Sequence, residues 1–462
     1  MKNYYKYLSD ACEIIDKGNK KYKGATGRAF YVIGASSAHL LYFYKNIESK
    51  SNFVFKNNEE IILARTIIKL KNIKKKINIT LDKPLLSFSE IKKIRLLKFI
   101  YYFGKNLLFN CFVSIKIKKV NCLFLWDNYK YINLFRLLLP RIKNSYLLLH
   151  NNNFFPRYFL KKTIKIPSLE TLNIGCKDVF EYNYLILKKA LLLYRPKVVV
   201  FAEGDSPSHS ILSSLCKDLK IKSVCLQWGS APRKSIKYGF RNFTCDQVLV
   251  HGNFFLNLIK KYTVKNIIKK TGNPLVDYNN KWAFKKRAIV LLQPELIQSM
   301  NSQNLNLFFY FISNVIKSNN DWKFVIRPHP SQNYCKVSNK FSKFSNCVLV
   351  DSKNISLKKS FTNCTVAFSI FSSSLTDGLS HQIIPFSFDT TGLLGTFQPD
   401  LNKLKIGIST DNIKDAILKA NNLLRNKKLI IEYCKNIKKY KFNINYKYGK
   451  QAINEICKYI RN

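Results

Sequence analysis

Three features are missing from this sequence of 462 residues, and each absence argues against a class of protein. Residues 1–17 contain no apolar stretch of about 7 to 15 residues, so we expect no secretory signal and a cytoplasmic protein. The most apolar window, residues 96–115, is interrupted by lysine, glycine and asparagine, which are too polar for a helix that spans lipid. The 12 cysteines form neither a Cys-x-x-Cys pair nor a Cys/His cluster, which argues against a disulfide framework and a zinc site.

Acidic residues are scarce: 27 Asp and Glu stand against 78 Lys and Arg, so the net charge is +51. Such a surplus attracts polyanions, among them nucleic acid, anionic membranes, nucleotides and acidic saccharides. The lysines are spread along the chain, as an AT-rich coding bias would produce, so we assign only part of the charge to function. No nucleic-acid reader motif is recognised, and we expect no nucleic-acid partner. We expect the remaining charge to favour an anionic membrane surface, with residues 95–119 as the leading segment.

Apolar residues are plentiful and indicate a folded protein. The hydrophobic fraction is 47%, with 34 Phe and 26 Tyr, which is enough to bury a substantial core. The length fits two domains of roughly 200 residues each. The sequence pattern changes near residues 281–287, so we expect domains at 1–280 and 281–462.

Short apolar runs alternate with helical patterns on both sides of this boundary. The expected strands before it are 30–33, 121–126, 146–150, 197–202, 223–227 and 247–250. Those after it are 288–292, 322–326, 347–350, 365–370 and 385–388. This alternation predicts an α/β protein with two doubly wound, Rossmann-like parallel sheets facing a central crevice, and ligands of such sheets bind at the carboxyl ends of the strands.

One strand end carries the turn Arg327-Pro328-His329-Pro330. The prolines stiffen the turn and hold the imidazole at the end of the strand. With an ordinary pKa of about 6.5, His329 could donate to a phosphate oxygen or protonate a departing phosphate. Arg327 could add a bidentate phosphate contact. The alternative is a loop whose histidine caps a backbone carbonyl.

A second strand end carries Ser372, Ser373 and Ser374 at the start of a helix. Hydroxyls and free N–H groups there favour anion binding, although a plain serine cap is the alternative. Three serines exceed what capping needs, so we favour phosphate binding. Asp377 either accepts hydrogen bonds from ribose hydroxyls or is a first-turn acid favoured by the helix dipole.

In the first half, Glu203-Gly204-Asp205 lies between a strand and the start of a helix. Either carboxylate could act as a general base on an acceptor hydroxyl if desolvation raises its pKa, and we favour Asp205 slightly over Glu203. The alternative is that Asp205 caps the helix while Glu203 is solvated. His209 in the same helix start is expected to be a surface or packing residue.

Three further turns that contain glycine are expected at the crevice. They lie at residues 227–230, 250–253 and 271–277, and they supply Gly229, Gly272 and Asn273 as candidate substrate-binding residues.

The order of motifs over residues 203–277 resembles the superfamily that joins UDP-N-acetylglucosamine 2-epimerase to GT-B glycosyltransferases. The second half departs from the epimerases, because Leu292-Gln293-Pro294-Glu295 replaces a His-Arg-x-Glu-Asn turn and no Gly-Gly-x-x-Glu-Glu run follows Ser373. The turn at 327–330 and the pair Ser372-Ser373 instead look like the HP and SS motifs of bacterial capsule and lipopolysaccharide transferases, such as polysialyltransferases and Kdo transferases.

This resemblance implies an inverting glycosyltransferase that extends a surface polysaccharide such as capsule or O-antigen, with a CMP-linked sugar as one candidate donor. Carried over to this chain, Glu203 or Asp205 is the base, and His329 with Ser372 or Ser373 contacts the nucleotide phosphate. No cofactor and no metal is expected. The expected partners are a nucleotide-sugar donor, a saccharide or lipid-linked acceptor, and an anionic inner-membrane surface. The alternative is a nucleotide-sugar 2-epimerase or hydrolase of the same superfamily.

Overall fold

The computed structural model of the chain describes thirteen segments, and all structural statements below concern them. They are residues 2–18, 25–82, 120–126, 131–149, 163–165, 179–204, 206–227, 245–260, 267–277, 283–294, 302–370, 372–391 and 399–461.

The first large sheet has seven parallel strands in the order β5-β4-β3-β6-β7-β8-β9. Their bounds are β3 (Cys122–Trp126), β4 (Ser145–Leu149), β5 (Thr163–Lys165), β6 (Val198–Ala202), β7 (Lys222–Leu226), β8 (Gln247–Val250) and β9 (Ile268–Lys270). In β3 and β6 every position is buried, which is why both read as continuous apolar runs: helices cover both faces of a parallel sheet. The helices of this part are α7 (Ile132–Leu138), the 3-10 turn η2 (Leu139–Arg141), α9 (Val179–Tyr194), α10 (Pro207–Asp218) and α12 (Asn253–Ile259).

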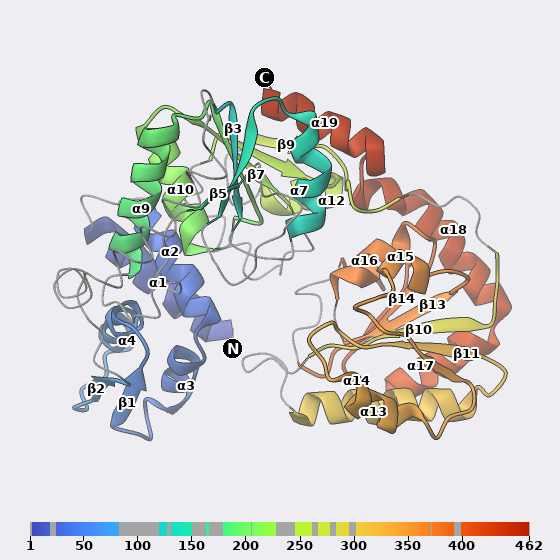
Figure 1. Cartoon of the computed structure of the whole chain (residues 1–462). Helices are drawn as coiled ribbons and strands as arrows, with labels where there is room; N and C mark the ends of the chain where they lie inside the picture. Colours follow the sequence, from blue (N-terminus) through green and yellow to red (C-terminus); the bar gives the residue numbers. More distant parts are fainter. Residues whose placement is uncertain are drawn as a thin grey trace.

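The second large sheet has six parallel strands in the order β12-β11-β10-β13-β14-β15. Their bounds are β10 (Arg287–Leu291), β11 (Lys323–Arg327), β12 (Cys347–Leu349), β13 (Val366–Ser369), β14 (Ile384–Phe388) and β15 (Ile408–Thr410). The helices here are α13 (Ser302–Ser318), α14 (Tyr334–Phe341), α15 (Leu357–Ser360), α16 (Ser373–Leu379), α17 (Ile413–Arg425), α18 (Lys427–Ile444) and α19 (Gly449–Arg461). Figure 1 shows the two sheets in two lobes of the molecule.

Both large sheets are wound in the same way. In each sheet, the second and third strands in the sequence lie on one side of the first strand, and the later strands lie on its other side. The strand order therefore reverses between β3 and β6 in the first sheet and between β10 and β13 in the second. Ligands of doubly wound sheets bind at such switch points. The turn at Glu203-Gly204 follows β6 and the serine turn follows β13, so each motif lies at a switch point.

The last helix returns to the first lobe (Figure 1). Ile453, Ile456 and Ile460 of α19 lie in one buried cluster with strand residues such as Phe124 and Val200 of the first sheet. The proposed domain division at residues 280/281 falls between β9 and β10, yet α19 lies beyond it in the sequence and packs on the first sheet.

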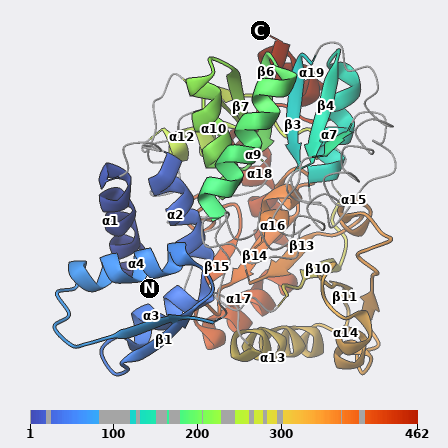
Figure 2. The ribbon, with the colours of Figure 1, turned by 60° about the vertical axis from the view of Figure 1, so that its left-hand side comes forward.

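Residues 2–18 and 25–82 form a separate group with a core of its own (Figure 2). It contains α1 (Lys2–Gly18), α2 (Ala25–Ser36), α3 (Ala38–Asn46), α4 (Asn58–Leu70) and a two-stranded parallel sheet of β1 (Asn52–Phe55) and β2 (Asn78–Leu81). Through α2 the group contacts α10.

The strand predicted at 30–33 is wrong, because these residues lie within α2. An apolar run of four residues has the same appearance in a helix and in a strand, and periodicity alone does not separate the two. Among the described helices, none combines the length and the apolar character that crossing a bilayer requires.

Candidate active site

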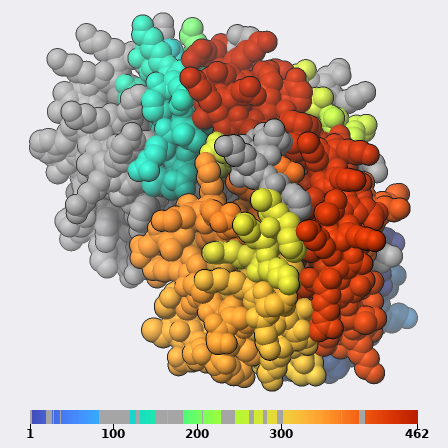
Figure 3. Space-filling view, turned by 90° about the vertical axis from the view of Figure 1, so that its right-hand side faces the viewer, coloured from blue at the N-terminus to red at the C-terminus, as the bar shows by residue number. Residues whose placement is uncertain are grey.

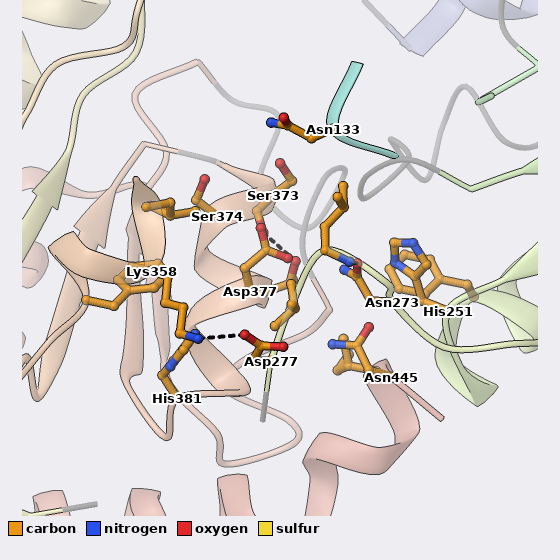
Figure 4. Close-up of a pocket in the computed structure, with 17 residues that line it drawn as sticks. Asn133, His251, Asn273, Asp277, Lys358, Ser373, Ser374, Asp377, His381 and Asn445 are labelled. Atoms are coloured by element: carbon orange, nitrogen blue, oxygen red, sulfur yellow. Dashed lines mark hydrogen bonds and ion pairs between the residues drawn. The ribbon is translucent and has the colours of Figure 1, made fainter. Parts of the chain in front are cut away.

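A pocket of about 480 Å³ lies between the two lobes (Figure 4). One wall comes from the turns that follow β8 and β9 and includes His251, Asn273 and Asp277. The opposite wall comes from α15 and α16. The pocket is therefore built from the carboxyl-terminal ends of strands in both sheets, where the sequence pattern predicted a crevice.

His251 follows β8 and is buried at the pocket wall. Its Nε2 lies 3.1 Å from the carbonyl oxygen of Gln227, and its main-chain N–H donates to Oε1 of the same residue at 2.9 Å. Burial lowers the pKa of His251 to about 4. A carbonyl only accepts hydrogen bonds, so the neutral ring carries its proton on Nε2 and keeps Nδ1 as an acceptor.

The turn after β9 is built around Gly272 and Asn273. Gly272 has a φ of +95°, and a Cβ on it would lie 2.2 Å from the carbonyl oxygen of Lys447. The missing side chain thus makes room for the chain that crosses from α18 to α19, and Gly272 is not among the described residues that line the pocket. Asn273 does line it, and its Oδ1 accepts from the N–H of Leu275 at 3.0 Å. The predicted substrate contact of Gly272 stays a prediction.

The second wall contains the serine turn. Ser372 is the N-cap of α16, and its hydroxyl accepts from the N–H of Ser374 at 3.1 Å. Ser373 and Ser374 line the pocket. Capping occupies the first serine, and the next two present their side chains to the pocket (Figure 4).

Asp377 lies beyond the first turn of α16 and lines the pocket. The interpretation of Asp377 as a first-turn acid is therefore wrong, because the helix begins at Ser373. Burial raises the pKa of its carboxyl to about 7. Within the described part of the chain, no residue donates a hydrogen bond to this carboxyl or pairs with it. Its charge therefore changes near neutral pH, where a ligand in the pocket would meet it.

An ion pair joins the two walls. Nζ of Lys358, on α15, lies 2.6 Å from Oδ2 of Asp277, in the turn after β9 (Figure 4). His381 lies beside them and packs its ring against Phe361 at a centroid distance of 5.5 Å. Burial lowers the pKa of His381, Lys358 lowers it further, and Asp277 raises it.

Arg327 and His329 are not among the described residues that line the pocket. The guanidinium of Arg327 donates to the carbonyl of Ile355 at 2.8 Å and to the hydroxyl of Ser360 at 2.7 Å, so it supports the segment that carries Lys358. Burial lowers the pKa of Arg327, and Asp351 opposes this. The phosphate contact of Arg327 stays a prediction.

The ring of His329 turns back on its own loop. Nδ1 accepts from the N–H of Ser331 at 3.2 Å and lies 2.7 Å from the hydroxyl of that residue. The main-chain N–H of His329 donates to Oε1 of Gln332 at 2.7 Å. Burial lowers the pKa of His329 below its ordinary value. Because Nδ1 accepts a hydrogen bond, neutral His329 keeps its proton on Nε2. This N–H could donate to a phosphate oxygen.

Glu203 follows β6 in an unusual conformation. Its φ is +67°, followed by +71° at Gly204, and a left-handed residue other than glycine costs on the order of 1–3 kcal/mol. Its Oε2 accepts from the hydroxyl of Tyr131 at 2.9 Å, and Asn133 of the same segment lines the pocket. Such strain is typical of functional sites. The predicted residues Asp205 and Gly229 lie outside the described residues.

His209 agrees with the packing interpretation. It is buried, stacks on Phe201 at a centroid distance of 5.3 Å, and its main-chain N–H donates to the hydroxyl of Ser206 at 3.2 Å. The hydroxyl of Ser206 thus caps the N-terminus of α10 as part of a capping box.

The pocket brings four predicted residues together: Asn273, Ser373, Ser374 and Asp377. Sequence reasoning missed Lys358 and His381, which have no motif around them. It included His251 and Asp277 in turns of interest without assigning them a role. Position at a strand end was the signal available for these two.

No protein-family model matches the sequence, and no curated protein does. Among solved structures, the UDP-GlcNAc 2-epimerase from Neisseria meningitidis bound to UDP-GlcNAc aligns over 74% of this chain and 100% of its own, with 12% identity and a TM-score of 0.52. The fold is of the GT-B type. The S. aureus MnaA structure with UDP aligns over 74% of this chain and 96% of its own, with 13% identity and a TM-score of 0.51. At such identities the likeness extends to the fold alone, and it confirms the two Rossmann-like domains predicted from the sequence.

Proposed function

We propose that this protein acts on a nucleotide-activated sugar and transfers the sugar, with inversion, to an acceptor in a bacterial surface polysaccharide such as capsule or O-antigen. The observation that supports this most is the pocket between the two lobes, which collects Asn273, Ser373, Ser374 and Asp377. We propose that residues 1–280 hold the acceptor and residues 281–462 the donor.

The size and lining of the pocket suit such a donor. Its volume of about 480 Å³ lies within the usual range of small-molecule sites, roughly 300–1,000 Å³. Serine hydroxyls can donate to phosphate oxygens, and a carboxyl at Asp377 can accept from ribose hydroxyls. Two proteins with similar folds were solved with UDP-GlcNAc or UDP bound, which supports a nucleotide sugar as the ligand class.

In the proposed reaction, Glu203 or Asp205 removes the proton from an acceptor hydroxyl as its oxygen attacks the anomeric carbon. The bond between that carbon and the nucleotide phosphate breaks, and the phosphate leaves with the electron pair. His329 through Nε2–H, together with Ser372 or Ser373, stabilises the charge on the leaving phosphate. We also propose that Arg327 contacts the leaving phosphate, and its described hydrogen bonds hold the segment that carries Lys358.

An epimerase or hydrolase of nucleotide sugars is the second candidate, since the structure with the TM-score of 0.52 is a 2-epimerase. The two candidates differ in their need for an acceptor. A transferase incubated with CMP-, UDP- or GDP-sugars and no acceptor should largely stall, and adding an oligosaccharide acceptor should start turnover. Free sugar or an epimerised donor formed without acceptor would contradict the transferase and support the second candidate.

A simpler measurement can identify the nucleotide of the donor. A ligand that binds only the folded state raises the melting temperature, so a thermal-shift screen of CMP, UDP, GDP and CDP ranks the nucleotides. We expect one of them to stabilise the protein at millimolar concentration, and a flat response to all four would contradict the proposed ligand class.

A further inference from the structure

One face of α18 combines lysines with exposed apolar side chains. In an α-helix each residue advances by about 100°, which places Lys428, Ile431, Lys435, Lys438 and Phe442 within an arc of about 80°. All five are exposed, with Ile431 at 38% and Phe442 at 52%. We call these five residues the α18 face. Figure 3 shows α18 and α19 as a continuous red ridge along one side of the molecule.

The lysines of this face form no ion pairs in the described part of the chain, although exposed Glu432 lies one turn from Lys428. In the described part of the chain, no carboxylate pairs with Lys428, Lys435 or Lys438. On the neighbouring helix α17, by contrast, Lys419 pairs with Asp415 at 2.8 Å. An exposed face that keeps three unpaired lysines beside an isoleucine and a phenylalanine favours an anionic surface with an apolar interior.

We infer that the α18 face docks on an anionic lipid bilayer. The lysine ammonium groups reach the phosphates of the headgroups, while Ile431 and Phe442 enter the boundary between headgroups and acyl chains. Nucleic acid would use the lysines but would gain nothing from Ile431, so the apolar members favour the bilayer.

The position of the face gives this docking a consequence for the pocket. The helix ends at Ile444, and Ile444 and Asn445 line the pocket. Docking of α18 therefore holds the pocket near the lipid surface. If the proposed transferase function holds, on which this step rests, the acceptor is a saccharide carried on a membrane lipid.

The docking is tested with the full chain and without any substrate, so its outcome is separate from that of the proposed activity. Cosedimentation is measured with vesicles of phosphatidylglycerol and phosphatidylcholine, and with phosphatidylcholine alone. One variant carries Lys428→Gln, Lys435→Gln and Lys438→Gln, and a second carries Ile431→Ser and Phe442→Ser. The matched control carries Lys317→Gln, Lys323→Gln and Lys336→Gln, which removes three exposed, unpaired lysines near α13 and α14. Unchanged melting temperatures establish that each variant is folded.

We expect binding to the anionic vesicles alone. The α18 lysine variant should lose about 100-fold in partitioning, at about fivefold per lysine, and the matched control less than about threefold. The apolar variant should also bind more weakly. Equal losses for the two lysine variants would overturn the inference in favour of general charge attraction. An apolar variant that binds normally would overturn it as well. Binding to single-stranded DNA is measured in parallel, and an α18 lysine variant that loses DNA binding but keeps vesicle binding would also overturn it.

Discussion

The carboxylate of Asp277 and the ammonium of Lys358 meet at 2.6 Å, and they come from opposite lobes of the molecule. One is in the turn after β9 and the other is on α15, with the pocket between them. Both side chains are largely exposed, at 59% and 64%, so water screens their attraction.

Removal of this ion pair should cost little stability. We expect Lys358→Ala to lower the free energy of unfolding by less than about 1 kcal/mol, as is typical of exposed pairs. The melting temperature should fall by no more than about 4 °C, measured by calorimetry. A larger fall would mean that the pair holds the two lobes together.

The raised pKa of Asp377 predicts a stability that depends on pH. Below about pH 4 the carboxyl is protonated in both the folded and the unfolded chain. As the pH rises toward 7 the unfolded chain releases its proton while the folded chain retains it, so the wild type loses stability until the pH passes the folded pKa of about 7. Asp377→Asn removes this penalty. It should stabilise the protein by up to a few kcal/mol at pH 8 and by little at pH 4, measured by urea unfolding.

Asp415 provides a control of opposite sign. Hydrogen bonds from Lys419 and Thr410 hold the pKa of its carboxyl below its ordinary value. Asp415→Asn should therefore destabilise the protein at neutral pH and lose this effect as the pH falls below the carboxyl pKa values. If both variants respond to pH in the same direction, the assignment of Asp377 is wrong.

Gly272 should not tolerate a side chain. In Gly272→Ala the new Cβ would meet the backbone of Lys447 and would hold alanine at a φ of +95°. We expect a loss of about 2–5 kcal/mol from overpacking and backbone strain. Gly18→Ala is the control, because nothing lies within 4 Å of the added Cβ, and its unfolding free energy should change by less than about 0.5 kcal/mol. Similar melting temperatures for both variants would refute the packing role of Gly272.

His329→Ala should leave the fold intact and lower the transfer rate by about 10² to 10⁴-fold, because the imidazole would act on the leaving phosphate and contributes little to the core. Initial rates with donor and acceptor measure this. His39→Ala on α3 is a matched control with an expected rate close to that of the wild type. Near-normal turnover in folded His329→Ala would remove this histidine from the mechanism.

The proposed base is tested by Asp205→Asn and Glu203→Gln. The base variant should lose turnover while its nucleotide affinity, measured by calorimetric titration, stays unchanged, because the base contacts the acceptor. Tyr131→Phe removes the hydroxyl that donates to Glu203 and should slow turnover if Glu203 is the base. Mild effects of both carboxylate substitutions would place the base elsewhere.

The sequence predicted the fold well because the evidence for it is local. An apolar run such as β6, bounded by a turn that contains glycine, indicates a buried strand without reference to the rest of the chain. The three-residue strands β5 and β9 carried too little pattern to be recognised, although β12, of the same length, was predicted at 347–350. The same limit produced the wrong strand at 30–33.

The candidate site was predictable only in part. Ser373 and Asp377 follow a strand, and position at a strand end is visible in the sequence. Lys358 reaches the pocket because α15 is held by Arg327, and His381 reaches it because α16 ends there. Both positions depend on how distant segments pack, which no local pattern contains.

The crossing of α19 onto the first sheet also sets the order in which the molecule can be completed during synthesis. Phe124 and Val200 leave the ribosome long before Ile453 and Ile460, which share their buried cluster. Until then α7 alone covers part of this flank of the nascent first sheet, and the part that α19 later covers is exposed to chaperones and to aggregation while the entire second sheet is being made. We therefore expect the first lobe to acquire protease resistance last, although most of it is synthesised first.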